Sequence, residues 1–161
     1  MQHTSDPKAA NVNVPAQTPN GRLYLENSQQ NVQDGLFVKI LFDSISAGFT
    51  DGIEDVVNHR IFPGVAGWYQ VNAYLLLESL IDACRYAIHV TRSGILVAHA
   101  EYLSPKTGTS TAYHISLGVS DVIKLTALQY LEVGIHHLDA TEIVDVLGEE
   151  TGSFLSVQRV R

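Results

Sequence analysis

Residues 67–77, GWYQVNAYLLL, constrain the fold of this chain more than any other segment. They follow a glycine-containing turn and are rich in aromatic and aliphatic side chains, which predicts a long β-strand. Because alternate residues of a strand face opposite sides of a sheet, the odd-numbered side chains fill the core on one side. Trp68, Tyr74 and Leu76 then project from the other side, although they are apolar too. This pattern predicts a second subunit over that face, with loose alternation in a monomer as the alternative.

The chain from residue 34 onward predicts an all-β domain. Short runs of β-branched, aromatic and aliphatic residues are separated by turn signals about every 8 to 12 residues, the spacing of a β-sandwich. The predicted strands are residues 36–42, 56–61, 67–77, 84–92, 95–103, 113–117, 122–130 and 154–160. Ser93 and Gly94 predict a tight hairpin, and residues 118–121 predict another turn. Residues 139–146 are interpreted as a loop and a strand.

Residues 1–33 are interpreted as an extended polar arm that precedes the domain of residues 34–161. The arm is rich in Asn, Gln, Ser and Pro and contains one apolar cluster, Leu23, Tyr24 and Leu25. So little apolar surface does not offset the entropy of ordering the segment by itself, which favours a disordered tail. The alternative is an arm that orders on a neighbouring subunit, where these three residues add a strand to a sheet edge.

The composition argues against several kinds of partner. The formal net charge is -7 and the sequence has no cluster of Lys and Arg, so we expect no nucleic-acid binding. No run approaches the roughly 18 apolar residues of a membrane helix, and the N-terminus lacks a signal-peptide pattern, so we expect no membrane partner and no export. The charged fraction of 17% lies below the roughly 25% of typical domains, which favours a surface covered by other subunits.

The residues that often carry chemistry do not form a recognisable site. His99 and Glu101 can share one face of a strand, whereas His136 and His137 cannot, and no third metal ligand can be named. Cys84 is the single cysteine of the sequence, so no internal disulfide can form, which agrees with synthesis in a reducing cytoplasm. We interpret Cys84 as a small buried residue. Because no nucleophile or phosphate-loop motif is present, we expect no enzymatic activity and no cofactor.

A stretch of acidic residues near the C-terminus offers oxygen ligands for calcium. These residues are Asp139, Glu142, Asp145, Glu149 and Glu150. Their spacing is not that of an EF-hand, so a solvated acidic loop is the preferred interpretation.

Four segments together resemble the C1q/TNF-like jelly roll, in particular its forms in virion proteins of tailed bacteriophages. The segments are residues 67–74, 84–103, 116–125 and 152–157. Residues 67–74 are similar to a Gly-x-Tyr-x-Phe strand of this family, with Val71 at the second aromatic position. Residues 84–103 are similar to the hairpin that follows this strand in the family. The third is similar to a Leu-x-x-Gly-Asp-x-Val-x-Leu element, with Ser120 in place of glycine. The last is similar to the closing Phe-Ser-Gly-x-Leu strand, with its small residues rearranged.

This resemblance implies a jelly-roll β-sandwich that assembles as a homotrimer. Tyr69, Tyr86 and Phe154 are then candidates for the core or the threefold contact, together with Trp68, Tyr74 and Leu76 on the outer face of the long strand. The implied function is that of a structural virion protein, a capsid decoration or cement protein on the outer capsid surface. Such a trimer bridges neighbouring capsomers and has the major capsid protein as its partner.

Two other functions remain open at the level of sequence. The same trimer at a tail or head fibre tip would recognise a cell-surface glycan or protein through its loops. A soluble signalling ligand of the C1q/TNF type is the third possibility, and the missing secretory signal argues against it. The short arm, which does not resemble a long fibre shaft, favours decoration.

Overall fold

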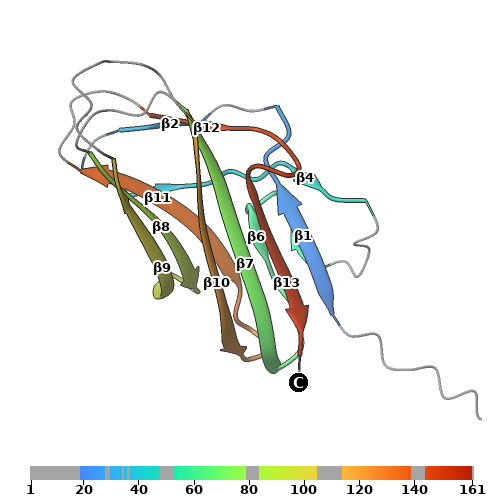
Figure 1. Ribbon diagram of the computed structural model, residues 1–161. Helices are drawn as coiled ribbons and strands as arrows, with labels where there is room; N and C mark the ends of the chain where they lie inside the picture. The colour runs from blue at the N-terminus through green and yellow to red at the C-terminus, as the bar shows by residue number, and fades with distance from the viewer. Residues whose placement is uncertain are drawn as a thin grey trace, which may run out of the picture.

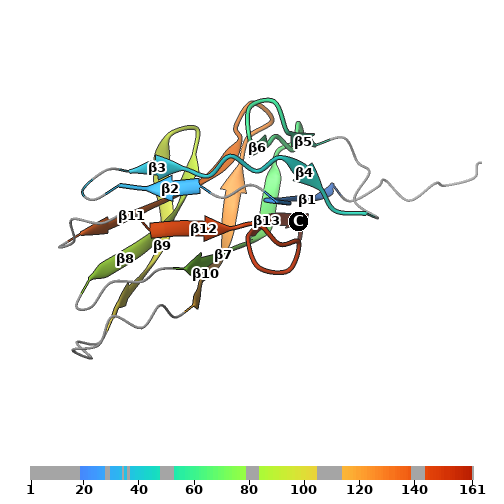
Figure 2. The same cartoon turned by 90° about the horizontal axis from the view of Figure 1, so that it is seen from above.

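A computed structural model describes residues 19–27, 30–33, 35, 37–47, 53–78, 84–104, 114–138 and 144–160 of the chain. Within these residues all regular elements are β-strands, and all strand pairings are antiparallel. No helix in the described ranges is long and apolar enough to span a bilayer. The strands form two layers, which Figure 1 shows from the side and Figure 2 from above.

The first layer is built around β7, and we call it the β7 sheet. It contains β1 (Asn20–Tyr24), β2 (Gln30–Val32), β4 (Ser44–Ile45), β7 (Gly67–Glu78), β10 (Ile115–Leu125), β12 (Val144–Leu147) and β13 (Phe154–Arg159). The second layer, the β8 sheet, contains β3 (Val38–Lys39), β5 (Glu54–Asp55), β6 (Arg60–Ile61), β8 (Arg85–Arg92), β9 (Ile95–Leu103) and β11 (Leu131–Leu138). Strand β7 is central in its sheet, since it pairs with β10 along one edge and with β12 and β13 along the other.

The hydrophobic core lies between the two sheets. Along β7 the odd-numbered residues from Tyr69 to Leu77 are buried, and the even-numbered residues point outward, as the alternation predicts. Buried aliphatic residues of β8, β11 and β13 complete the core. The long strand therefore has the two faces that its sequence indicates.

The hairpin between β8 and β9 also forms where it was predicted. Ser93 and Gly94 both adopt positive φ, 50° and 82°, which suits a two-residue turn whose twist matches that of the flanking strands. Strand β13 agrees with the closing strand predicted at residues 154–160. Within the described residues 37–42 of the predicted strand at 36–42, Val38 and Lys39 form β3, and the Ile40 amide donates to the Val133 carbonyl of β11 at 2.9 Å. Residues 56–59 form a turn between β5 and β6.

The predicted turn at residues 118–121 is wrong, because β10 runs without a break from Ile115 to Leu125 and pairs with β7 throughout. Gly118 lies opposite Tyr74, and a Cβ at residue 118 would be 2.3 Å from Cε1 of the Tyr74 ring. The glycine thus makes room for a neighbouring side chain within a strand. The strand predicted at 122–130 is the second half of β10 and ends at Leu125, and residues 126–130 form the turn that leads into β11.

The apolar cluster of the N-terminal segment belongs to the sandwich of its own chain. Strand β1 pairs with β13 and β4, and the side chains of Leu23 and Leu25 are fully buried in the core. Tyr24 projects to the other side and is half-buried. This corrects the expected contact of Leu23 and Leu25 with neighbouring subunits, since both side chains are already occupied. Residues 1–18 lie outside the described part of the chain.

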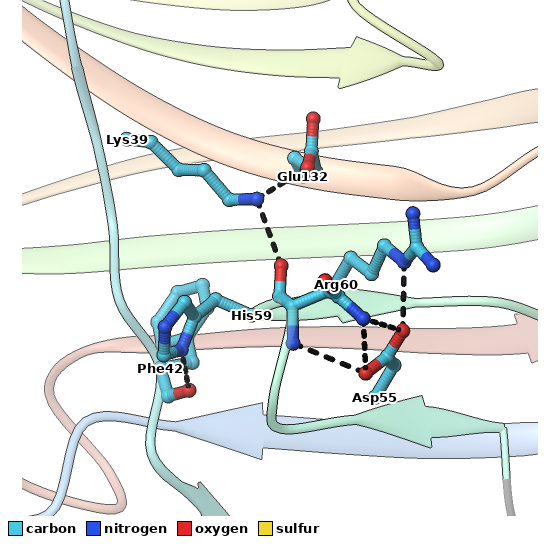
Figure 3. Close-up of polar contacts among 7 residues, drawn as sticks. Lys39, Phe42, Asp55, His59, Arg60 and Glu132 are labelled. Atoms are coloured by element: carbon cyan, nitrogen blue, oxygen red, sulfur yellow. Dashed lines mark hydrogen bonds and ion pairs between the residues drawn. The ribbon is translucent and has the colours of Figure 1, made fainter.

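The segment that contains β3 crosses one edge of the β8 sheet and is held there by polar contacts (Figure 3). Lys39 Nζ donates to the Asn58 carbonyl at 2.8 Å and forms an ion pair with Glu132. Nδ1 of His59 donates to the Phe42 carbonyl, also at 2.8 Å. These contacts fix a connection that has little regular structure of its own.

Candidate functional site

The outer face of the β7 sheet carries a group of apolar side chains that the described residues leave partly exposed. Trp68 is 42% exposed, Tyr74 and Val122 are also exposed, and Leu76 and Phe154 are half-buried. Strand register places all five on one side of the sheet, because Trp68, Tyr74 and Leu76 share the outer side of β7 and pair with outward residues of β10 and β13. We call these five residues the aromatic face.

The upper part of the aromatic face is held in place by contacts within the chain. The rings of Tyr74 and Phe154 are 5.2 Å apart between centroids, and the Arg22 guanidinium lies 3.9 Å from the Phe154 centroid. Arg22 Nη2 donates to the Glu150 carbonyl at 2.6 Å. Gly118 leaves the space into which the Tyr74 ring leans. Such a fixed aromatic surface loses little conformational entropy when a partner covers it.

A small polar network occupies the middle of the same sheet face, between Trp68 and Tyr74 along β7. Gln70 Nε2 donates to Ser120 Oγ at 2.9 Å, and Ser120 Oγ donates to Asn72 Oδ1 at 2.7 Å. Burying a polar group costs free energy mainly when it loses its hydrogen bonds. Because these three side chains bond to one another, a partner can cover them at modest cost.

Trp68 marks the lower part of the aromatic face. Lys124, its register partner on β10, has its Nζ 5.9 Å from the centroid of the indole ring. The Trp68 carbonyl accepts a hydrogen bond from the Val160 amide at 2.8 Å, which ties the end of β13 to the start of β7. The indole ring therefore lies on a well-anchored backbone.

Two of the predicted packing residues are core residues and do not reach the surface. Tyr69 and Tyr86 are both fully buried. The Tyr69 hydroxyl donates to the Val65 carbonyl at 2.7 Å, and burial raises the pKa of this phenol. The structure thus divides the six predicted packing residues into two in the core and four on the aromatic face.

The sequence did not indicate Val122 or the polar network as parts of this face. Val122 was placed in a separate strand after a turn, so its position beside β7 was not visible. The signal that identifies it is the even-numbered spacing of Ser120, Val122 and Lys124, once residues 115–125 are treated as one strand.

The histidines considered as metal ligands lie on two sides of the β8 sheet. His99 is the register partner of His89, and the ring of His136 is 4.8 Å from that of His89 on the same outer face. His137 points inward, is fully buried, and donates through Nε2 to the Val32 carbonyl at 2.9 Å. In the described parts of the chain no three His, Cys, Asp or Glu side chains have an arrangement that could hold a metal ion.

The remaining candidates take structural positions. Cys84 is buried, and its Sγ donates to the Leu138 carbonyl at 3.0 Å. Asp145 is the register partner of Glu78, and burial followed by the charge of Glu78 raises the pKa of Asp145. Glu149 and Glu150 are exposed, and the calcium candidates Asp139 and Glu142 lie outside the described residues.

Solved structures share this fold at low sequence identity. Eiger TNF from S. frugiperda superposes with a TM-score of 0.67 at 14% identity, over 89% of this chain and 93% of its own. Murine APRIL at pH 5.0 superposes with a TM-score of 0.63 at 12% identity, over 88% of this chain and 99% of its own. No protein-family model matches the chain, and no curated protein matches its sequence. The structural matches confirm the predicted all-β, TNF-like jelly-roll sandwich.

Proposed function

We propose that this chain is a non-enzymatic structural protein that forms a homotrimer through the aromatic face. The observation that carries the proposal is the set of exposed apolar side chains on the outer side of the β7 sheet. Exposed aromatic and aliphatic side chains gathered on one sheet face, here on both sides of a hydrogen-bonded polar network, mark a protein interface. The satisfied polar network in its middle and the fixed Tyr74 and Phe154 rings support burial of the whole face.

Three copies are favoured over two by the fold. The chain has a TNF-like sandwich, and the resemblance of its sequence to the C1q/TNF-like jelly roll implies assembly as a homotrimer. In a closed cyclic trimer each subunit buries one part of its surface against a different part of its neighbour, so closure of the ring leaves neither part open for further growth.

The role that we propose for the trimer is decoration of a phage capsid. The support is the resemblance of the four sequence segments to virion proteins of tailed bacteriophages, together with the low charged fraction of the chain. In this role the trimer sits on the outer capsid surface and bridges neighbouring capsomers of the major capsid protein. Because it binds the assembled shell and not its free subunits, it stabilises the shell by mass action.

The trimer is tested by placing a charge in the aromatic face. We expect Tyr74→Glu to shift the protein from the mass of three 17.6 kDa chains to that of one, because a buried unpaired carboxylate costs several kcal/mol. Light scattering coupled to size-exclusion chromatography measures this mass. Val57→Glu is the matched control, since Val57 is 87% exposed in the turn between β5 and β6. A monomeric wild-type chain, or a trimeric Tyr74→Glu variant, would refute the interface.

The capsid role is tested separately by locating the protein on virions. Purified virions from the source of the sequence are labelled with an antibody to this chain and imaged by negative-stain electron microscopy. Label over the head supports decoration. Label at the tail or fibre tips would overturn decoration in favour of receptor recognition, and unlabelled virions would overturn both.

A further inference from the structure

One end of the sandwich differs in character from the rest of the molecule. At this end β7 begins beside the end of β10, and β8 ends beside the starts of β9 and β11. In Figure 1 it is the lower end, where the C-terminus also lies. We call it the loop end and define it as residues 62–66, 92–96, 124–130 and 158–160.

Exposed apolar side chains are concentrated at the loop end. Six of the fourteen exposed large hydrophobic residues of the described chain lie there. They are Phe62, Val65, Ile95, Leu96, Leu128 and Val160. Leu128 is 83% exposed at a turn and Ile95 is 65% exposed beside the hairpin tip, so both side chains are available for contact with a partner.

The loops of this end are tied to one another and to the strands. The Ser93 amide donates to the Tyr130 carbonyl at 3.0 Å, which joins the β8–β9 turn to the β10–β11 turn. Arg92 Nη1 donates to the Lys124 carbonyl at 3.0 Å, and Arg159 Nη2 donates to the Ala66 carbonyl at 3.0 Å. The exposed apolar side chains are therefore presented by a connected frame.

The charge of the loop end is opposite to that of the whole chain. Its residues include Arg92, Lys124 and Arg159 and contain no Asp or Glu, whereas the chain as a whole has a formal net charge of -7. Each basic residue that lies within a Debye length of an anionic lipid surface strengthens binding to that surface about fivefold. Aliphatic side chains on projecting loops add to this when they enter the interfacial layer.

From these observations we propose that the loop end is a docking surface for an anionic lipid membrane. The aliphatic tips enter the headgroup region, while Arg92 and Arg159 remain at the level of the lipid phosphates. Lys124 lies beside Trp68, where the loop end borders the aromatic face, and adds its charge from that border. Hydropathy alone predicts no membrane partner, because no apolar run is long enough to span a bilayer. A contact through the loop end needs no spanning segment and is therefore compatible with that hydropathy. Exposed aliphatic side chains next to basic residues match the two layers of an anionic membrane interface, because the aliphatic groups suit the acyl boundary and the cations suit the phosphates.

The test is flotation of the full-length chain with vesicles of phosphatidylcholine, with and without phosphatidylserine. We expect binding to the vesicles that contain phosphatidylserine, weakened by added salt. Ile95→Ser and Leu128→Ser should each lower the vesicle affinity about tenfold, the loss expected for one inserted aliphatic side chain. Lys124→Gln should lower the affinity for anionic vesicles and leave that for neutral vesicles unchanged.

Val57→Ser is the matched control, because Val57 is exposed but lies outside the loop end, and its affinity should equal that of the wild-type chain. Circular dichroism of each variant establishes that it is folded. The proposal is overturned if the wild-type chain does not float with anionic vesicles at low ionic strength. It is also overturned if the double variant Ile95→Ser, Leu128→Ser floats as well as the wild-type chain.

Discussion

His89 shows how neighbouring side chains set the chemistry of a single residue on the outer face of the β8 sheet. Its ring stacks on Phe37, with 5.5 Å between centroids, and lies 6.2 Å from the ring of His99 and 4.8 Å from that of His136. Partial burial lowers the pKa of His89 first, and the charges of His136 and His99 lower it further, against the opposing charge of Glu101. His89 is thus held in its neutral form.

This lowered pKa makes the stability of the domain depend on pH. A histidine whose folded-state pKa lies below its unfolded value of 6.5 contributes stability above that pH, and the contribution is lost as the pH falls through the folded pKa. We expect the free energy of unfolding in urea to decrease between about pH 7 and pH 5, and to decrease less in His89→Gln, which has no proton to gain.

His114→Gln serves as the control for this pH dependence. His114 is exposed and pairs with Glu78 at 2.9 Å, away from the three clustered histidines. An equal change of stability with pH in His89→Gln and in the wild-type chain would show that His89 is not the residue responsible.

At the scale of the element, β1 shows that the N-terminal segment is needed for the fold. Its backbone pairs with β13 from Asn20 to Tyr24, and Leu23 and Leu25 fill the core. Val32 of β2 is fully buried as well. A chain without these strands leaves one edge of β13 unpaired and opens cavities in the core.

Two truncations separate this role from that of the preceding residues. We expect removal of residues 1–18 to leave the free energy of unfolding in urea within about 0.5 kcal/mol of that of the full chain, because the described strands all remain. Removal of residues 1–33 should abolish cooperative unfolding, since Leu23 and Leu25 alone each contribute about 2 to 5 kcal/mol at buried sites. Circular dichroism during urea titration measures both. A cooperative transition in the chain that begins at residue 34 would contradict the role of β1.

The elements that could be predicted from sequence are those whose signal is local. The alternation along β7 and the Ser93–Gly94 turn lie within single segments, so they identified the long strand, the hairpin and three residues of the aromatic face. Strand β1 was predicted only as a strand added to a neighbouring subunit, because β13, which pairs with it in its own chain, is distant in sequence. Gly118 resembles a turn residue in the sequence because the side chain that requires a glycine there, the Tyr74 ring, lies on another strand.

At the scale of the whole molecule, the aromatic face and the loop end are two surfaces for which we propose different roles. The first runs along the outer side of the β7 sheet, and the second closes one end of both sheets. In a cyclic trimer built on the aromatic face, the three loop ends are related by rotation and are displaced the same way along the axis. Three weak lipid contacts on one side of such a trimer then act together, so the avidity exceeds the affinity of a single chain.

The close approach of Gly118 to Tyr74 also constrains how this sequence can change. A side chain at residue 118 would overlap the tyrosine ring unless residue 74 became smaller. The two positions are therefore expected to co-vary among homologous chains, with glycine at 118 accompanying an aromatic residue at 74. Changes at Tyr74 on the aromatic face, which we assign to subunit contact, thus depend on Gly118, a residue without a side chain of its own.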